Sequence, residues 1–227
     1  MSATTSPTRS KVAAAADAIA AIRPGATVMV GGFGLVGAPL TLIEALRTSD
    51  SAGDLTIISN NLGEPGRGLG RLLLDGRVRK AVGSYFTSNP DVVRAHQRGD
   101  LEVELVPQGT LAEAIRAGGA GIGGFYTKTG LGTPLTEGCA ERVIRGERYV
   151  LQDARRADVA LIRARTADEL GNLTYTKTAR NINPDMATAA DLVIAEVDEI
   201  VPVGALDPEA VVTPHLFVDV LVLAVRA

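Results

Sequence analysis

The chain has 227 residues, of which 46% are hydrophobic and 22% are charged, and its formal net charge at pH 7 is −3. That composition is ordinary for a globular protein and supplies enough apolar residues to bury a sizeable core. Acidic and basic residues are interspersed, so the sequence favours neither a nucleic-acid partner nor a membrane surface, and small neutral or anionic ligands fit it better.

Cysteine and histidine are too sparse to suggest a redox or metal centre. Cys139 is the only cysteine, so an intrachain disulfide is excluded, and no Cys/His cluster has metal-ligand spacing. No apolar run approaches the roughly 20 residues that a membrane-spanning helix requires. We therefore predict a cytoplasmic protein that binds no metal.

Residues 1–10 are rich in Ser, Thr and Pro and are predicted to form a flexible tail. The remainder, 11–227, shows no internal repeat and no interdomain linker, which indicates one domain. Apolar residues at helical spacing over 12–22 predict an amphipathic helix. Strand and helix patterns then alternate along the chain: strand 26–30, helix 39–48, strand 55–58, helix 68–74, strand 78–82, helix 90–97, strand 101–106 and helix 111–117.

This alternation predicts an α/β fold with an open, largely parallel sheet flanked by helices. The next segment, 118–138, holds eight glycines and has no long periodicity, which favours a functional loop or a small flap over an idle connection. The stretch VIRGERYVLQ indicates a hairpin that turns at 145–147. The remaining expected elements are strand 158–162, strand 173–175, helix 184–190, strand 192–197 and strand 216–225.

The first strand runs into VGGFGLVGAP, in which residues 32–37 form a G-x-G-x-x-G motif ahead of a helix. A dinucleotide-binding unit also needs an acidic residue about 20 positions further on, at the end of the second strand. That strand ends instead in Ser59, Asn60 and Asn61. Nicotinamide binding is therefore disfavoured, and two alternatives remain: glycines that approach a phosphate or an amide-rich ligand, or glycines that only allow strand and helix to pack tightly.

A second candidate follows strand 101–106, where Pro107 ends the strand and leaves Gln108 at its carboxyl end. Open α/β sheets bind their ligands at that edge. The glutamine amide suits the stabilisation of an oxyanion in acyl transfer, and the alternative is a turn glutamine that satisfies loop carbonyls. Asn60 and Asn61 end another strand, so three polar or glycine-rich stretches converge on one edge of the sheet and favour a binding cleft there.

Six segments, taken in order, carry a resemblance to a known family. They are VGGFGLVGAP, SNNLGEPGRGLG, LEVELVPQGTLAEAIRAGGAGIGGFYT, GNLTYTKTARNINP, DLVIAEVDEIV and ALDPEAVVTPHLFVD. Over residues 26–222 the chain resembles the first, or alpha, of the two subunit types of family I CoA-transferases, which include 3-oxoacid, acetate and 3-oxoadipate CoA-transferases. The resemblance implies the open α/β fold of that family. It also implies a reaction that moves CoA from succinyl-CoA or acetyl-CoA to a 3-oxo acid such as acetoacetate.

The resemblance further implies that two chains share the chemistry. In the family, a glutamate of the second, or beta, subunit type attacks the thioester and then carries CoA as a glutamyl-CoA thioester, which splits one hard exchange into easier steps. This chain lacks the Ser-Glu-Asn-Gly stretch that holds the glutamate, and Asn60 lies at the nearest counterpart. An amide cannot replace a carboxylate nucleophile. The chain is therefore expected to be inactive without the beta subunit, with which it forms a heterodimer or heterotetramer.

Site residues follow from the same resemblance. Gln108 matches the family glutamine that donates to the thioester oxygen. CoA is expected as a substrate and not as a permanently bound cofactor, and the other partners implied are the beta subunit, an acyl-CoA and short carboxylic acids. The residues expected to contact CoA are Gly31, Gly32, Phe33, Gly34, Leu35, Val36, Gly37, Asn60 and Asn61.

Two other functions remain open from the sequence. Departures from common family residues at Pro24, Lys128 and Leu131 bear on the acyl substrate, which leaves a 3-oxoadipate CoA-transferase as one alternative. Lys128 is either a reader of the acceptor carboxylate or a solvated loop residue. A non-catalytic metabolite-binding module is the alternative from another class, since fold does not determine function. The retained Gln108 favours the enzyme, because a regulator has no evident use for an oxyanion donor.

Overall fold

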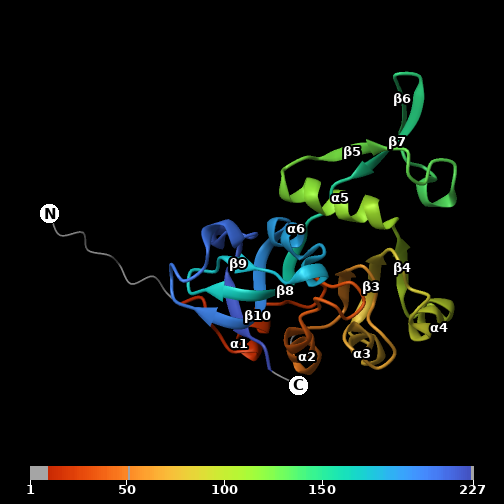
Figure 1. Ribbon diagram of the computed structural model, residues 1–227. Helices are drawn as coiled ribbons and strands as arrows, with labels where there is room; N and C mark the ends of the chain where they lie inside the picture. Colours follow the sequence, from red (N-terminus) through yellow and green to blue (C-terminus); the bar gives the residue numbers. More distant parts are fainter. Residues whose placement is uncertain (1–9, 51, 226–227) are drawn as a thin grey trace.

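The computed structural model describes residues 10–50 and 52–225 and is built around a parallel sheet (Figure 1). Seven strands pair in the order β11-β10-β8-β1-β2-β3-β4, and every neighbouring pair in this order is parallel. The sheet is open, so the predicted α/β fold with a largely parallel sheet is confirmed. Its strands are β1 (Thr27–Val30), β2 (Leu55–Ile58), β3 (Val78–Gly83), β4 (Glu102–Leu105), β8 (Ala157–Asp168), β10 (Ala190–Val201) and β11 (Val220–Leu223), with β9 (Leu173–Thr174) antiparallel to β8.

Helices cover both faces of this sheet (Figure 1). One layer holds α1 (Ala15–Ile19), α2 (Leu40–Thr48), α3 (Leu69–Leu74) and α4 (Pro90–Arg98), and the other holds α5 (Gln108–Gly119) and α6 (Asn183–Thr188). Alternate strand residues point to opposite faces and serve the two layers. Val28 therefore lies in one apolar core with Leu42 of α2, while Met29 lies in the other with Leu111 of α5.

A small antiparallel sheet extends away from the body beyond α5 (Figure 1). In spatial order its strands are β5 (Gly124–Thr127), β7 (Glu147–Asp153) and β6 (Glu141–Ile144). Residues 120–153 are termed the flap below. The turn between β6 and β7 uses left-handed backbone at Arg145 (φ 53°) and Gly146 (φ 81°), as a two-residue hairpin turn requires. The predicted hairpin is confirmed.

The predicted helix over 12–22 was wrong in extent, because only Ala15–Ile19 is helical. The Lys11 carbonyl accepts the Leu221 N–H at 2.8 Å, and the Ala13 N–H donates to the Leu221 carbonyl at 2.9 Å. The chain before the helix is therefore extended and paired with β11. The backbone groups of β11, at the edge of the sheet, need hydrogen-bond partners, and residues 11–13 supply them. This pairing with a strand distant in sequence prevails over the helical spacing of the local apolar residues.

The extent of one further element, at the end of the chain, was also wrong. The predicted terminal strand 216–225 is reduced to Val220–Leu223, since His215–Phe217 form a turn of 3-10 helix directly after Pro214. For the glycine-rich segment 118–138 the sequence left a functional loop or a small flap, and the structure shows the flap. Helix α5 continues to Gly119, and β5 within the segment pairs with β7.

Strands β8 and β10 extend well past the predicted strands 158–162 and 192–197. Their extensions carry charges in place of a continuous apolar run. Arg163 of β8 pairs with Glu196 of β10 at 2.5 Å and also with Asp198 of β10. Arg163 and Asp198 lie beyond the predicted strands, whereas Glu196 lies within one, so the pairing of the two strands shows that the sheet continues.

The tail predicted over residues 1–10 lies outside the described residues except for Ser10. Within the described ranges, no helix is long and apolar enough to cross a membrane. Over those same ranges, no group of three or more His, Cys, Asp or Glu side chains is arranged so that it could hold a metal ion.

The buried carboxylate of Asp168 closes the turn between β8 and β9. It accepts hydrogen bonds from the Gly171 N–H at 2.9 Å, the Asn172 N–H at 2.9 Å and the Asn172 side-chain amide at 2.7 Å. Burial disfavours the charged carboxyl, but these hydrogen bonds outweigh burial and hold the pKa of Asp168 below its ordinary value of 3.8. Such a group stabilises the fold above that ordinary pKa, and the stabilisation is lost as the pH falls through the lower folded-state pKa.

Asp168→Asn is expected to lower the free energy of unfolding near neutral pH by about 1–3 kcal/mol, because its NH2 group faces donors and leaves them unpaired. The difference from wild type should shrink as the pH falls below 3.8. Urea unfolding at a series of acid and neutral pH values measures the loss of unfolding free energy and its dependence on pH. Asp191→Asn, at an exposed position, is the control and should change stability by less than about 0.5 kcal/mol. If the stability difference between Asp168→Asn and wild type widened in acid, the lowered pKa of Asp168 would be contradicted.

Candidate active site

Four loops meet at the edge of the main sheet where the parallel strands end. They follow β1, β2, β3 and β4, which are neighbours in the sheet. These loops carry the glycine loop (residues 31–37), Asn60, Ser84 and Gln108. Ligands of open α/β sheets bind outside this edge. The structure thus brings together the three stretches that the sequence indicated and adds a fourth.

Gln108 begins α5, and its side-chain oxygen is held by the two neighbouring loops. Gln108 Oε1 accepts a hydrogen bond from Asn60 Nδ2 at 2.8 Å and a shorter one from Ser84 Oγ. Asn60 Nδ2 also donates to Ser84 Oγ at 3.0 Å. With Oε1 held by two donors, the Gln108 NH2 group points away from them, and it has no acceptor among residues 10–50 and 52–225. Because Gln108 is only half-buried, this NH2 group is available to a bound molecule.

Asn60 and Asn61 are buried within the chain itself. The Asn60 carbonyl accepts the Ser84 N–H at 3.0 Å, while its side chain binds Gln108. Asn61 Oδ1 accepts the Gly63 N–H at 3.2 Å, which closes the kind of turn that asparagine commonly forms. Contact of these two asparagines with CoA stays a prediction.

Ser84 is the member of this cluster that sequence reasoning missed. It follows Gly83, where a Cβ would lie 2.5 Å from the Ser59 carbonyl oxygen, so the close approach of β3 to the loop after β2 requires glycine. The sequence did contain one indication of its role, because Ser84 is a hydroxyl residue directly after the last residue of β3, at the same edge of the sheet as Gln108. Its hydrogen bond to Gln108 joins two strands and leaves no local pattern in the sequence.

The glycine loop is held by a segment about 150 residues further along the chain. Asn181 Nδ2 donates to the Val36 carbonyl at 3.1 Å, and Asn183 Nδ2 donates to the Gly37 carbonyl at 3.1 Å. The Gly32 N–H in turn donates to Asn181 Oδ1 at 3.3 Å. These two asparagines, which the sequence did not single out, therefore determine the shape of the loop.

The two ends of the glycine loop need glycine because they lie against this segment. A Cβ on Gly31 would lie 1.8 Å from Asn183 Oδ1, and one on Gly37 would lie 2.2 Å from the Ala179 carbonyl oxygen. Neither distance is compatible with a side chain. Tight packing, one of the two alternatives left by the sequence, therefore accounts for these two glycines.

The tip of the glycine loop is open by contrast. Phe33 and Val36 exchange backbone hydrogen bonds of 2.9 and 3.2 Å that close a narrow turn. Their side chains are 58% and 54% exposed. Gly34 has a left-handed φ of +62°, yet a Cβ there would meet no atom within 4 Å. The tip is thus free to contact a ligand or a second chain.

The helix that follows the loop already has a carboxylate at its N-terminus. Glu196 Oε2 accepts the Leu42 N–H of α2 at 3.1 Å, and Glu196 is buried. Burial raises the pKa of Glu196, although the Leu42 N–H and Arg163 both favour its charged form. The pyrophosphate of a dinucleotide would need this helix N-terminus. Together with the missing acidic residue after β2, this arrangement disfavours nicotinamide binding.

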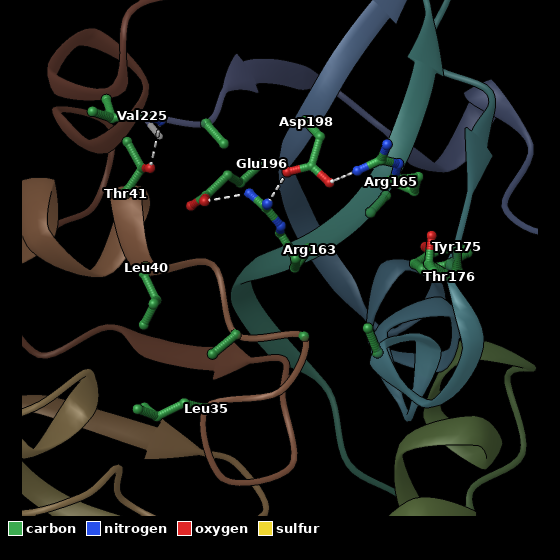
Figure 2. A pocket seen from close by; sticks show the side chains of 15 residues that line it. Leu35, Leu40, Thr41, Arg163, Arg165, Tyr175, Thr176, Glu196, Asp198 and Val225 are labelled. Carbon is green, nitrogen blue, oxygen red and sulfur yellow. Dashed lines mark hydrogen bonds and ion pairs between the residues drawn. The ribbon is translucent and has the colours of Figure 1, made fainter. Parts of the chain in front are cut away.

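A cavity of about 410 Å³ lies between the glycine loop, the N-terminus of α2 and the extensions of β8 and β10 (Figure 2). In Figure 2, Arg163 lies between Glu196 and Asp198, and Arg165 binds the other oxygen of Asp198 at 2.9 Å. Both arginines are therefore paired with carboxylates. Asn60, Ser84 and Gln108 do not line this cavity, so it is separate from the Gln108 cluster.

The open α/β sheet thus carries a polar cluster of Asn60, Ser84 and Gln108 at its strand ends. Comparison with known proteins identifies the family. A family model described as Coenzyme A transferase matches residues 12–224. The chain belongs to the coenzyme A transferase family. The resemblance inferred from the six sequence segments is therefore confirmed.

Several curated members of the coenzyme A transferase family, each the first or alpha subunit of its enzyme, match most of the chain. The alpha-type subunit of succinyl-CoA:3-ketoacid coenzyme A transferase from Xanthomonas campestris pv. campestris (strain B100) is 53% identical to this chain. The match covers 92% of this chain and 87% of the relative. The corresponding subunit of 3-oxoadipate CoA-transferase from Pseudomonas putida is 50% identical, and the match covers 90% of this chain and 89% of the relative. The alpha subunit of acetate CoA-transferase from Escherichia coli (strain K12) is 45% identical, and the match covers 95% of this chain and 98% of the relative.

Solved structures of the coenzyme A transferase fold also match. A thioester complex with CoA of an acyl-CoA transferase from Escherichia coli O157:H7 has a TM-score of 0.85 at 25% identity and covers 95% of this chain. This chain spans 50% of that longer one. Glutaconate coenzyme A-transferase from Acidaminococcus fermentans has a TM-score of 0.83 at 24% identity, covers 95% of this chain and 76% of its own, and supports the fold.

Two glycines of this coenzyme A transferase loop allow a matched test of its packing. Gly37→Ala is expected to lower the free energy of unfolding by about 3 kcal/mol, because left-handed strain adds to a steric clash with the Ala179 carbonyl. Gly34→Ala has the same backbone strain without the clash and should cost only about 1–2 kcal/mol. Urea unfolding of both variants measures the difference. Equal losses would show that segment 179–183 does not hold the loop.

Proposed function

We propose that this chain is the alpha subunit of a heteromeric CoA-transferase that is active only together with its beta subunit. The reaction moves CoA from succinyl-CoA or acetyl-CoA to a 3-oxo acid such as acetoacetate. The observation that carries the proposal is the Gln108 NH2 group, oriented and without an acceptor among the described residues at the ligand-binding edge of the sheet. The names of the relatives from Xanthomonas and Escherichia support the same reaction class.

The exchange begins when a glutamate carboxylate attacks the thioester carbonyl carbon of the acyl-CoA. The carbonyl oxygen becomes negative, and the Gln108 N–H groups donate to it. Collapse expels CoA thiolate and leaves a mixed anhydride between the acyl group and the glutamate. The thiolate then attacks the glutamyl carbonyl, which releases the donor acid and forms glutamyl-CoA. The acceptor acid reverses the same steps and leaves as the new acyl-CoA.

The attacking carboxylate comes from a second chain. Asn60, at the counterpart position, is an amide that donates to Gln108 and cannot attack a thioester. Apolar side chains of Phe33, Tyr85 and Leu105, from three of the four loops or strand ends at this edge, are 58%, 57% and 45% exposed. Exposed apolar groups around a polar site are typical of a protein interface. We therefore assign the beta subunit to this edge of the sheet.

CoA enters as a substrate, and no cofactor remains bound. The exposed tip of the glycine loop, at Phe33 and Val36, supports a contact with CoA in this proposal. Cys139 is a free thiol, which fits a reducing cytoplasm. No membrane or nucleic-acid partner is required by the reaction.

A second candidate keeps the reaction and changes the acceptor to 3-oxoadipate, the acid in the name of the Pseudomonas relative. Lys128 of the flap does not favour either acid. Its ammonium group pairs with Glu147 at 3.1 Å and lies 5.4 Å from the centre of the Tyr149 ring. The contacts support a surface lysine that is already partnered, and not a reader of the acceptor carboxylate.

Co-expression with the product of the neighbouring reading frame tests the proposal. CoA exchange from succinyl-CoA and acetyl-CoA to acetoacetate and to 3-oxoadipate is expected in the purified complex and absent in this chain alone. The preferred acceptor separates the two candidates. If no partner co-purifies or restores exchange, and the chain alone still binds acyl-CoA, the metabolite-binding module is the better function.

Gln108→Ala is expected to lower the kcat of the complex by roughly 10- to 1,000-fold, the effect of losing one oxyanion donor. The KM for acyl-CoA should change much less, because the donor acts mainly when charge develops on the oxygen. Gln97→Ala, on the exposed face of α4, is the matched control and should leave kcat within about twofold. An unchanged kcat in Gln108→Ala would remove Gln108 from the mechanism.

A further inference from the structure

We propose that Ser84 and Asn60 are positioning residues that determine which end of the Gln108 amide faces the substrate. This inference rests on the proposed function and deepens it. Three neighbouring strands supply one group each: Asn60 follows β2, Ser84 follows β3 and Gln108 follows β4. The role of Ser84 is not suggested by any sequence motif, and the role of Asn60 differs from the contact with CoA expected from the sequence.

A glutamine side chain has two ends of similar size and opposite hydrogen-bonding character. One end is a carbonyl oxygen that only accepts, and the other is an NH2 group that only donates. With the oxygen toward the substrate, Gln108 would repel a developing oxyanion instead of stabilising it. Catalysis by Gln108 therefore requires a device that selects one of the two orientations.

The structure supplies that device as two donors aimed at one oxygen. Asn60 Nδ2 lies 2.8 Å from Gln108 Oε1, and Ser84 Oγ approaches the same oxygen more closely. Reversing the amide would place the NH2 group of Gln108 against the NH2 group of Asn60. The Ser84 hydroxyl can accept as well as donate, so it would still bind the reversed amide and does not select an orientation by itself. It accepts the Asn60 NH2 group at 3.0 Å and so holds that group in place. Loss of the Asn60 hydrogen bond disfavours the reversed orientation by roughly 5-fold.

Both donors are held in place by the backbone. The Ser84 N–H donates to the Asn60 carbonyl at 3.0 Å, which joins the loops after β2 and β3. The Ser84 hydroxyl also lies 3.1 Å from this carbonyl, which is a second acceptor beside Gln108 Oε1. Asn60 is buried, so its amide is fixed by the chain and does not need the substrate to orient it.

Kinetics of the active complex test this role with four variants. Ser84→Ala and Asn60→Asp are expected to lower kcat by about 3- to 100-fold, up to the effect of Gln108→Ala, with KM for acyl-CoA within about threefold of wild type. The carboxylate introduced by Asn60→Asp accepts hydrogen bonds and should draw the Gln108 NH2 group away from the substrate. Ser84→Thr retains the hydroxyl and should restore kcat to within about threefold. Ser59→Ala removes a neighbouring hydroxyl that binds the Val30 carbonyl at 2.7 Å, and it should leave kcat within about twofold.

A double-mutant cycle separates orientation from general damage to the fold. In the Gln108→Ala background, Ser84→Ala should cause no further loss of kcat, because no amide remains to be oriented. Additive losses, or a Ser84→Ala enzyme with wild-type kcat, would overturn the inference.

NMR spectroscopy of the full chain tests the orientation without any activity. A scalar coupling across the hydrogen bond is expected between the Asn60 side-chain nitrogen and the Gln108 side-chain carbonyl carbon, and it should vanish in Asn60→Asp. Its absence in wild type would overturn the inference even if the complex transfers CoA. Conversely, a complex that shows the coupling but transfers no CoA would refute the proposed function and leave the orientation of Gln108 established.

Discussion

Parallel pairing of β1, β2, β3 and β4 brings four strand ends to one edge of the sheet, and the hydrogen bonds among Asn60, Ser84 and Gln108 depend on it. Each strand contributes one short loop, and the loops lie close enough for side chains to bind across them. Gly83 shows how little space this leaves, since a Cβ there would approach the Ser59 carbonyl oxygen to 2.5 Å. The two helical layers bury both faces of the sheet and so hold these strand ends in register.

Contacts from the second half of the chain decide what the first half can bind. The motif after β1 matches a dinucleotide pattern, but Asn181 and Asn183 hold its ends, and Glu196 caps the helix that would receive a pyrophosphate. Only the tip of the loop, with its exposed Phe33, remains for a ligand or a partner. A short glycine motif therefore has no functional meaning until its distant neighbours are known.

Much of the fold and part of the site could be predicted from local pattern. Apolar runs separated by amphipathic segments correctly indicated the α/β fold, and strand ends correctly brought Gln108 and Asn60 to one edge. Ser84 was missed because its partner lies on another strand. The extension of β8 was missed because Arg163 is tolerated in the sheet through its pairing with Glu196 and Asp198 of the neighbouring strand.

By itself, the sequence determined the family, the order of strands and helices, and the lack of a carboxylate at Asn60, because these depend on residue identity and local periodicity. Only the tertiary structure decided which end of the Gln108 amide is free. Residue identity specifies that a glutamine has a donor end and an acceptor end. Which end faces outward depends on the Asn60 NH2 group, which donates to the glutamine oxygen, and on Ser84, which holds that NH2 group in place. The sheet brings these two residues to Gln108 from 48 and 24 positions away.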